Sequence, residues 1–592
     1  MRKRNEIDAS MKWDLTPIYP DAAAMETDLA DCGAMAEKIA ACAGTLSTKE
    51  GLAAALGLTF GAMEKLERAS CYAYLNYSLD GGNTAAQEMM AKTQNAGVTL
   101  MTAMSFMEPE MLTVPEEELK AWLDDPALAT YRHYVLDVIR AKAHTLDAKG
   151  EAILSQVAKI TGTASDTYDM FTDVEMEIPK IENENGEMVE LTSGNFGMYR
   201  ESSCRKVREN AFNTMFGTYK KYNNTFATLY AGNVKKDNML AAIRGYDSAC
   251  EAALFAGNVP VSVYDSLVGG VHEALPVMQK YLELRKKVLN LPELDVFDLY
   301  CPMTADVEYP MPFEEGRELV KKALAPLGEE YAALLDRAFS ENWIDVYETP
   351  GKASGAYSMG IYGAHPYVLL NYTDTLDDAF TLAHELGHSM HSHYSNTTQD
   401  YVNHDYKIMV AEVASTVNEV LLTKYLLATE TDPARRAYVL NHFLEGFRTT
   451  VFRQTLFAEF ERKAHELEQS GTPLTADCLN GIYAELEKTY YSAAKMQDVV
   501  SVEWSYIPHF YRAFYVYQYA TGFSSAVAIA SHILETGDTA GYLRFLTTGG
   551  SDYPLNELRI AGIDLTSPAV VENAMQVFAE TIDELAAVLV KE

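Results

Sequence analysis

The stretch formed by residues 381–394, TLAHELGHSMHSHY, constrains the fold and chemistry of this chain more than any other part of the sequence. Within it, His384, Glu385 and His388 form an H-E-x-x-H pattern. Positions four apart lie one above the other on a helix face, so the two histidines can present imidazole nitrogens to one Zn²⁺ ion. Glu385 lies beside them, where it can take a proton from a water activated by the metal. The pattern predicts metal-assisted hydrolysis of a peptide bond.

Two histidines and a glutamate can fall into this spacing by accident, so the flanking residues must support a helix. Thr375 can serve as the N-cap, and Asp377 and Asp378 place negative charge in the first turn, where the helix dipole favours it. Gly387 is a poor helix former just before the second histidine. We expect a packing reason for this glycine, such as the close approach of another backbone.

The third ligand of the predicted metal site separates the known classes of zinc peptidase, because a catalytic zinc usually takes three protein ligands and leaves a place for water. A metzincin would continue as H-x-x-G-x-x-H, but His391 and Tyr394 occupy the corresponding positions, which excludes that class. Glutamate zincins with a shorter link would place their ligand at Lys407 or Ile408, which disfavours them as well.

A glutamate on a following helix is the remaining alternative for the third ligand. Residues 411–422, AEVASTVNEVLL, have the pattern of an amphipathic helix that carries Glu412 and, two turns later, Glu419. We predict Glu412 as the third ligand. Glu419 is then either a solvated or ion-paired carboxylate or a hydrogen-bond partner of a ligand.

HELGHSMH followed at this separation by AEVASTVNE resembles the thimet oligopeptidase-like zinc metallopeptidases, and most closely their bacterial oligoendopeptidase F branch. Residues 13–19 (WDLTPIY), 355–371 (GAYSMGIYGAHPYVLLN) and 508–522 (PHFYRAFYVYQYATG) are similar to that branch too, so the resemblance covers nearly the whole chain. It implies a mostly α-helical, gluzincin-type metallopeptidase with a small β-sheet beside the zinc helices and a deep substrate channel. It also implies one Zn²⁺ per chain and oligopeptide substrates.

Residues 502–522 are dense in aromatic side chains with polar tips. Peptide hydrolysis passes through a tetrahedral oxyanion, and hydrogen-bond donors aimed at it lower the barrier. The resembling family supplies such donors from a histidine and tyrosines in this region. On a helix, Tyr511, Tyr515 and Tyr519 would form one stripe with His509 near its start. We predict His509, Tyr515 and Tyr519 as donors; the alternative is that the tyrosines are core residues.

A chain of 592 residues is too long for one simple core, so we expect at least two subdomains. Most of residues 1–170 show helical apolar spacing, whereas residues 173–191 alternate around an Asn-Gly turn and predict a β-hairpin. We therefore predict an N-terminal helical region, residues 1–195, and a catalytic domain, residues 196–592. Residues 355–371 are the other β signal, and one edge of such a sheet can pair with an extended peptide.

The net charge of −36 argues against nucleic acid or an anionic membrane as a partner. Seven scattered cysteines without a C-x-x-C pair fit reduced thiols in the cytoplasm. The first residues, MRKRNEIDASMKW, lack the apolar core of a signal peptide, and no run of 18 apolar residues predicts a membrane span. We therefore expect a cytoplasmic protein; the sequence leaves its oligomeric state open.

The sequence is most consistent with a zinc endopeptidase that cuts internal bonds of short peptides, with Glu385 as general base. A zinc exopeptidase is a rival within the enzymes; it would need a charged clamp for a peptide terminus, a feature that the sequence leaves open. A catalytically inactive helical protein that binds peptides or acts as a scaffold is the rival from another class. The presence of Glu385 beside the ligand set argues against it, because a binding protein needs no general base.

Overall fold

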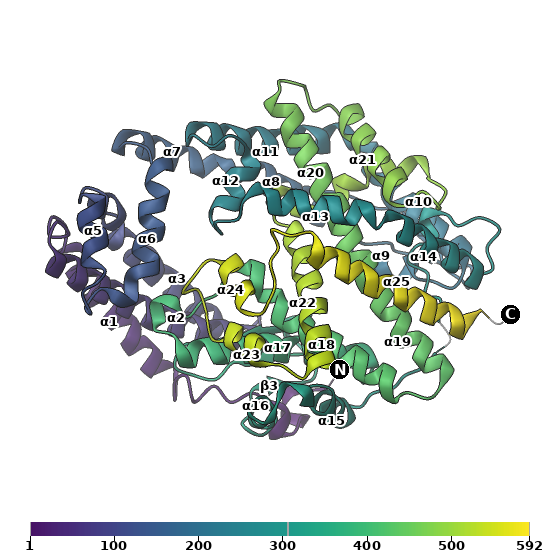
Figure 1. Cartoon of the computed structure of the whole chain (residues 1–592), viewed down its shortest axis with the longest axis horizontal. Coiled ribbons are helices and arrows are strands. Elements are labelled where there is room, and N and C mark those ends of the chain that lie inside the picture. Colours follow the sequence, from purple (N-terminus) through teal and green to yellow (C-terminus); the bar gives the residue numbers. More distant parts are fainter. Residues whose placement is uncertain (1, 305–306, 591–592) are drawn as a thin grey trace. The chain divides into compact units, whose positions relative to one another are not determined.

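The computed structural model describes residues 2–304 and 307–590, most of which lie in α-helices (Figure 1). The chain forms two compact units, each assembled from three separate segments. Unit 1 comprises Met1–Ala143, Tyr309–Tyr425 and Ile529–Ile563, and unit 2 comprises His144–Glu308, Leu426–Ala528 and Asp564–Glu592. No helix within the described ranges is long and apolar enough to cross a membrane.

Unit 1 begins with three long helices that pack against one another, α1 (Ala22–Ala40), α2 (Lys49–Leu79) and α3 (Thr84–Met104). Each begins at a capping side chain that accepts a hydrogen bond from the first turn: Asp21, Thr48 and Asn83. Together with α4 (Met107–Met111), α5 (Glu116–Trp122) and α6 (Arg132–Ala141) they bury an aliphatic core. These helices confirm the helical prediction for the start of the chain.

The rest of unit 1 contains a three-stranded sheet of β3 (Ile344–Asp345), β4 (Tyr357–Met359) and β5 (Tyr367–Leu369). β5 lies in the middle, parallel to β3 and antiparallel to β4, so β4 is an edge strand. Trp13 packs edge-on against Tyr367, with ring centroids 6.1 Å apart. The helices of this part are α15 (Phe313–Ala323), α16 (Glu329–Ser340), α17 (Leu376–Thr398), most of α18 (Ile408–Thr429), α23 (Ala540–Leu546) and α24 (Pro554–Ile560).

Unit 2 is almost entirely helical in its described residues. Its α-helices are α7 (Ala148–Thr161), α8 (Thr163–Asp169), α9 (Phe196–Arg200), α10 (Arg205–Lys221), α11 (Asn223–Ile243), α12 (Ala249–Phe255), α13 (Val261–Glu273), α14 (Leu275–Val288), α19 (Pro433–Gly446), α20 (Arg453–Gln469), α21 (Ala476–Tyr490), most of α22 (Tyr517–Thr536) and α25 (Ala569–Leu589). A π-helical segment, Phe447–Phe452, joins α19 to α20.

The predicted hairpin is present but shorter than expected. Its strands are β1 (Ile181–Glu182) and β2 (Met188–Val189), and Gly186 closes the turn with a φ of 80°. Residues Met170–Glu175, whose second half was expected to be strand, form a π-helical turn that continues α8. Phe171 in this turn packs against Phe226, with ring centroids 5.6 Å apart. The packing of this ring favours the helical turn over the strand that the alternating sequence pattern predicts.

Candidate metal centre

Helix α17 carries the H-E-x-x-H pattern and begins where the sequence predicts. Thr375 is its N-cap: its hydroxyl oxygen accepts a hydrogen bond from the Asp378 amide (3.3 Å), while Asp378 Oδ2 accepts one from the Thr375 amide (2.9 Å). This capping box fixes the first turn. Leu382 and Leu386 are fully buried, which anchors the helix and leaves His384 and His388 half-buried on another face.

The backbones of α17 and α18 touch at Gly387. A Cβ atom at this position would lie 2.5 Å from Ser415 Cα and 2.7 Å from the carbonyl oxygen of Ala414, well inside van der Waals contact. This confirms the expected packing reason for the glycine. A second contact between these helices is not among those predicted from the sequence: buried Asn418 donates from Nδ2 to the Ala383 carbonyl (3.0 Å). The sequence does carry a signal for this contact: Asn418 is an amide side chain among the apolar positions of α18.

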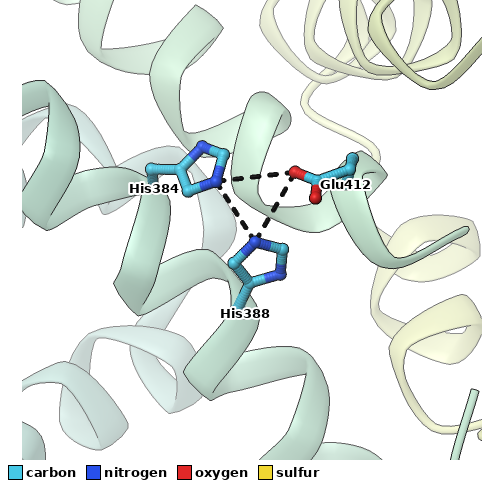
Figure 2. A group of neighbouring side chains, drawn as sticks. All are labelled: His384, His388 and Glu412. Atoms are coloured by element: carbon cyan, nitrogen blue, oxygen red, sulfur yellow. Dashed lines mark hydrogen bonds and ion pairs between the residues drawn. The ribbon is translucent and has the colours of Figure 1, made fainter. Parts of the chain in front are cut away.

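Three side chains converge where the two helices cross (Figure 2). His384 Nε2 lies 3.2 Å from His388 Nε2, and Glu412 Oε2 lies 3.5 Å from the first of these nitrogens and 3.6 Å from the second. Four tetrahedral ligands about 2.0–2.1 Å from a zinc ion are about 3.3 Å apart. The three donor atoms therefore fit a single zinc ion, and their chemistry, two imidazoles and one carboxylate, is that of a catalytic site.

Glu419, for which the sequence left two roles open, lies against a ligand histidine. Its Oε1 is 2.5 Å from His384 Nδ1, so the ring nitrogen on the far side from Glu412 has a carboxylate partner. Such a contact fixes the imidazole ring and makes it a better ligand. Burial alone would lower the pKa of His384, but the hydrogen bond to Glu419 and its charge raise that pKa to about 9.

Glu385 is the most buried carboxylate of the centre, with 7 % of its surface exposed. Burial raises its pKa above the ordinary range, and the nearby Glu412 and Glu419 act in the same direction, while the two histidines oppose them. A carboxylate with a raised pKa is a stronger base for removing a proton from water.

The predicted oxyanion donors belong to unit 2, where they form a group of their own. The ring centroids of Tyr515 and Tyr519 are 5.3 Å apart, and His509 lies 6.4 Å and 6.2 Å from them. Burial and the neighbouring Arg512 lower the pKa of His509, which favours its neutral ring. Tyr511 instead packs against Tyr168, at 4.7 Å.

The prediction of one helical tyrosine stripe is wrong. Two 3₁₀-helices, Asp498–Tyr506 and Pro508–Tyr511, precede α22, and Phe514 between them and α22 has a φ of 56°, which few non-glycine residues adopt. Fully buried Glu461 on α20 accepts a hydrogen bond from the Phe514 amide (2.7 Å). Burial raises the pKa of Glu461 well above its usual value, which favours the neutral form of this acceptor. No local sequence signal indicates this contact.

Two histidines of an H-E-x-x-H helix and a glutamate of the following helix define the gluzincin arrangement. The comparisons agree: residues 198–577 match peptidase family M3, and residues 110–178 match the oligopeptidase F N-terminal region. The chain therefore belongs to peptidase family M3, in its oligopeptidase F branch.

Individual relatives extend this likeness over the full length. Oligopeptidase PepF of Bacillus subtilis is 41% identical, with 99% of this chain and 88% of that one covered. An oligoendopeptidase F homolog of Lactococcus lactis is 38% identical over 99% of this chain and 98% of its own. The crystal structure of oligoendopeptidase-F from Enterococcus faecium has a TM-score of 0.76 at 36% identity, with 96% of this chain and 99% of that chain covered. These relatives confirm the mostly α-helical fold class.

Proposed function

We propose that this peptidase is a zinc-dependent oligoendopeptidase that hydrolyses internal bonds of short peptides, with Glu385 as general base. One observation carries the proposal: the three donor atoms of His384, His388 and Glu412 lie 3.2–3.6 Å apart, at the separation of tetrahedral zinc ligands. The contact between Glu419 and His384 supports it, because a ligand histidine usually has such a partner on its other nitrogen.

A zinc ion bound by these ligands supplies Lewis acidity, which polarises a peptide carbonyl and lowers the pKa of water. Glu385 accepts the proton of the attacking water and later donates it to the leaving amine. Its position one residue after His384 holds its carboxylate beside the ligands, and its burial excludes competing solvent. Glu419 keeps the His384 ring oriented during the reaction.

His509, Tyr515 and Tyr519 are proposed to donate hydrogen bonds to the oxyanion. The family resemblance and their mutual proximity support this assignment. A neutral imidazole carries one N–H and each phenol one O–H, so the group contains three donors. Removal of a single oxyanion donor typically lowers kcat by about 10²–10³-fold. Replacing either tyrosine by Phe should have that effect without loss of zinc.

Glu385→Gln tests the general base. The amide keeps the shape of the side chain but cannot accept the proton, so we expect full zinc content and kcat lower by at least ~10². Glu118→Gln, at an exposed position of α5, is the matched control and should leave kcat unchanged. Near-normal turnover of the Glu385 variant would assign the base elsewhere.

Mass spectrometry of a defined peptide set, incubated with and without a chelator, separates the three candidate functions. Internal cuts that the chelator abolishes support the endopeptidase. Trimming from one terminus would support the exopeptidase, and intact peptides would support a protein that only binds them. Elemental analysis of the same preparation should find one zinc per chain.

A substrate-enclosing channel is also part of the proposal, and the family resemblance supports it. A long chain would have to thread such a channel, and ordering each extra residue costs about 1–2 kcal/mol of backbone entropy. We therefore expect a higher kcat/KM for a cleavable sequence in a decapeptide than for the same sequence in a long unfolded chain. Equal values would refute the enclosed channel.

Two further predictions from the sequence remain predictions. One is the division into an N-terminal region, residues 1–195, and a catalytic domain, residues 196–592; the two family matches, on either side of residue 195, support it. The other is the cytoplasm as the site of action.

A further inference from the structure

A small cavity within unit 1 opens beside the helix that carries the proposed metal ligands. Its volume is ≈ 240 Å³, and it lies between the ends of β4 and β5 and the first two turns of α17. We call it the Asp378 pocket; its walls include Gly355, Ala356, Leu370, Asn371, Asp378 and Thr381. Sites for whole ligands usually measure about 300–1,000 Å³, so this cavity suits a single side chain.

The pocket lies close to the metal centre along α17. Thr381 precedes His384 by three residues and Asp378 precedes it by six, which at 1.5 Å per residue places them about 4.5 Å and 9 Å away along the helix axis. Successive residues of an extended peptide are about 3.3 Å apart. The edge strand β4, to which such a peptide can add, ends at the same pocket. A side chain within about two residues of the cleaved bond would therefore reach it.

Two oxygen atoms of the pocket wall, Asn371 Oδ1 and Asp378 Oδ1, have no hydrogen-bond donor among the described residues. Asn371 donates from Nδ2 to the carbonyls of Ala353 (2.9 Å) and Gly355 (2.8 Å), and its buried Oδ1 has no hydrogen-bond partner within the described ranges. Asp378 uses Oδ2 for the amides and hydroxyls of Thr373 and Thr375. None of the hydrogen bonds found among the described residues uses its Oδ1.

The charge of the pocket is negative. Asp378 contributes one negative charge from the wall, and exposed Asp374 and Asp377 add two more on the same loop and turn. The N-terminus of α17 opposes them with only about half a positive charge. The field therefore favours a cation.

A cationic pair behind Leu370 does not reverse this balance. Lys352 donates to the Leu370 carbonyl (2.5 Å), and it is paired with Asp345 at 2.8 Å. Arg4 also pairs with Asp345, at 2.7 Å. Glu348, which acts electrostatically on Lys352, balances the second positive charge.

We propose that the Asp378 pocket binds the side chain of a lysine or arginine of the substrate, within two residues of the cleaved bond. Such a side chain brings an apolar stem for Ala356 and Leu370 and donors for Asp378 Oδ1 and Asn371 Oδ1. The peptidase then prefers peptides with a basic residue at that position. The inference rests on the proposed peptidase function and adds a substrate class to it.

Matched peptides test the preference. Each peptide contains one cleavable bond and carries either lysine or its uncharged analogue norleucine at one of the four positions nearest that bond. For the wild-type protein we expect kcat/KM to be at least about fivefold higher with lysine at one fixed position, and the ratio to fall as salt screens the charge. Asp378→Asn should reduce that ratio to below about twofold.

Asp377→Asn is the matched control, because Asp377 is the neighbouring exposed aspartate of the same helical turn and does not line the pocket. Because it removes only a solvent-exposed charge outside the pocket, it should keep most of the lysine ratio of the wild type. The side-chain amide in Asp378→Asn can still accept the hydrogen bonds of the helix cap. Thermal unfolding of this variant should therefore give a Tm close to that of the wild type. Thr381→Lys provides a second variant: its own ammonium should occupy the pocket and abolish the preference without removing the cap.

Cleavage at equal rates with lysine and norleucine at all four positions would refute the inference and leave the proposed function intact. Equal loss of the ratio in Asp377→Asn and Asp378→Asn would also refute it, since a general field rather than the pocket would then be responsible. If the zinc-loaded protein cuts none of the peptides, the proposed function itself fails, and the inference with it.

Discussion

Gly387→Ala should damage the metal centre although it changes no ligand. The added Cβ would lie 2.5 Å from Ser415 Cα, whereas ordinary contacts begin at 3.4 Å, so the backbones of α17 and α18 must separate by roughly 0.9 Å. Metal–ligand distances tolerate only about ±0.2 Å. Because Glu412 is on α18 and the histidines are on α17, the separation would pull the carboxylate out of bonding distance.

The magnitude follows from the loss of one ligand. We expect zinc affinity to fall by at least about 100-fold, which corresponds to about 2.7 kcal/mol. Overpacking should also cost about 1–3 kcal/mol of stability, which offsets or exceeds the ~1 kcal/mol that alanine gains over glycine in a helix. Competition with a chromogenic chelator measures the zinc Kd, and thermal unfolding of the metal-free protein measures stability.

Gly232→Ala is the control for the Gly387 variant. Gly232 is an exposed residue of α11, and a Cβ atom there meets nothing within 4 Å. This variant should keep the zinc Kd and gain about 0.4–1 kcal/mol of stability. If Gly387→Ala also kept the zinc Kd and raised Tm, the contact between the two helices would not position the ligands, and the reasoning would be refuted.

Three further outcomes are expected. Glu419→Gln should weaken zinc binding by about 10–100-fold in a chelator titration, because the amide lacks the charge that holds its histidine partner. Burial raises the pKa of Glu557 from 4.5 to about 8, so the folded state holds a proton that the unfolded state releases. The free energy of unfolding should therefore fall as the pH rises from 4.5 to 8, by up to about 1.4 kcal/mol per pH unit. Glu557→Gln should flatten this pH dependence, as measured by urea unfolding at pH 5 and pH 8. Glu461→Ala should lower kcat at unchanged zinc content, whereas Glu461→Gln, which keeps a neutral acceptor for Phe514, should preserve kcat.

The parts of the centre that the sequence predicts are those whose causes are local. Thr375 and Asp378 cap α17 through residues three apart, and the histidine spacing fixes a shared helix face. The glycine at 387 indicates a close neighbour because few other causes place glycine inside a helix. Glu412 follows from a helix that is itself evident in the sequence.

The parts that the sequence does not predict depend on distant residues. The backbone of Phe514 adopts its positive φ beside a carboxyl group on α20, 53 positions earlier in the chain. The Asp378 pocket forms where the ends of β4 and β5 meet the first turns of α17. Each of these strands has only three residues, which is too short for a recognisable alternating pattern. Neither arrangement has a periodicity or spacing from which it could be inferred.

The contact of Trp13 with β5 has a consequence for the order in which the chain can fold. Trp13 packs on Tyr367, and the hydroxyl of that tyrosine donates to the Asp14 carbonyl (2.8 Å). Roughly 350 residues separate the two segments, so at synthesis rates of about 5–20 residues per second the N-terminal segment waits about 20–70 s for its partner. Unit 1 also needs Ile529–Ile563, near the end of the chain. Unit 1 is therefore completed only after the other two segments and most of unit 2 have been synthesised, and its N-terminal segment depends until then on partners that come later in the chain.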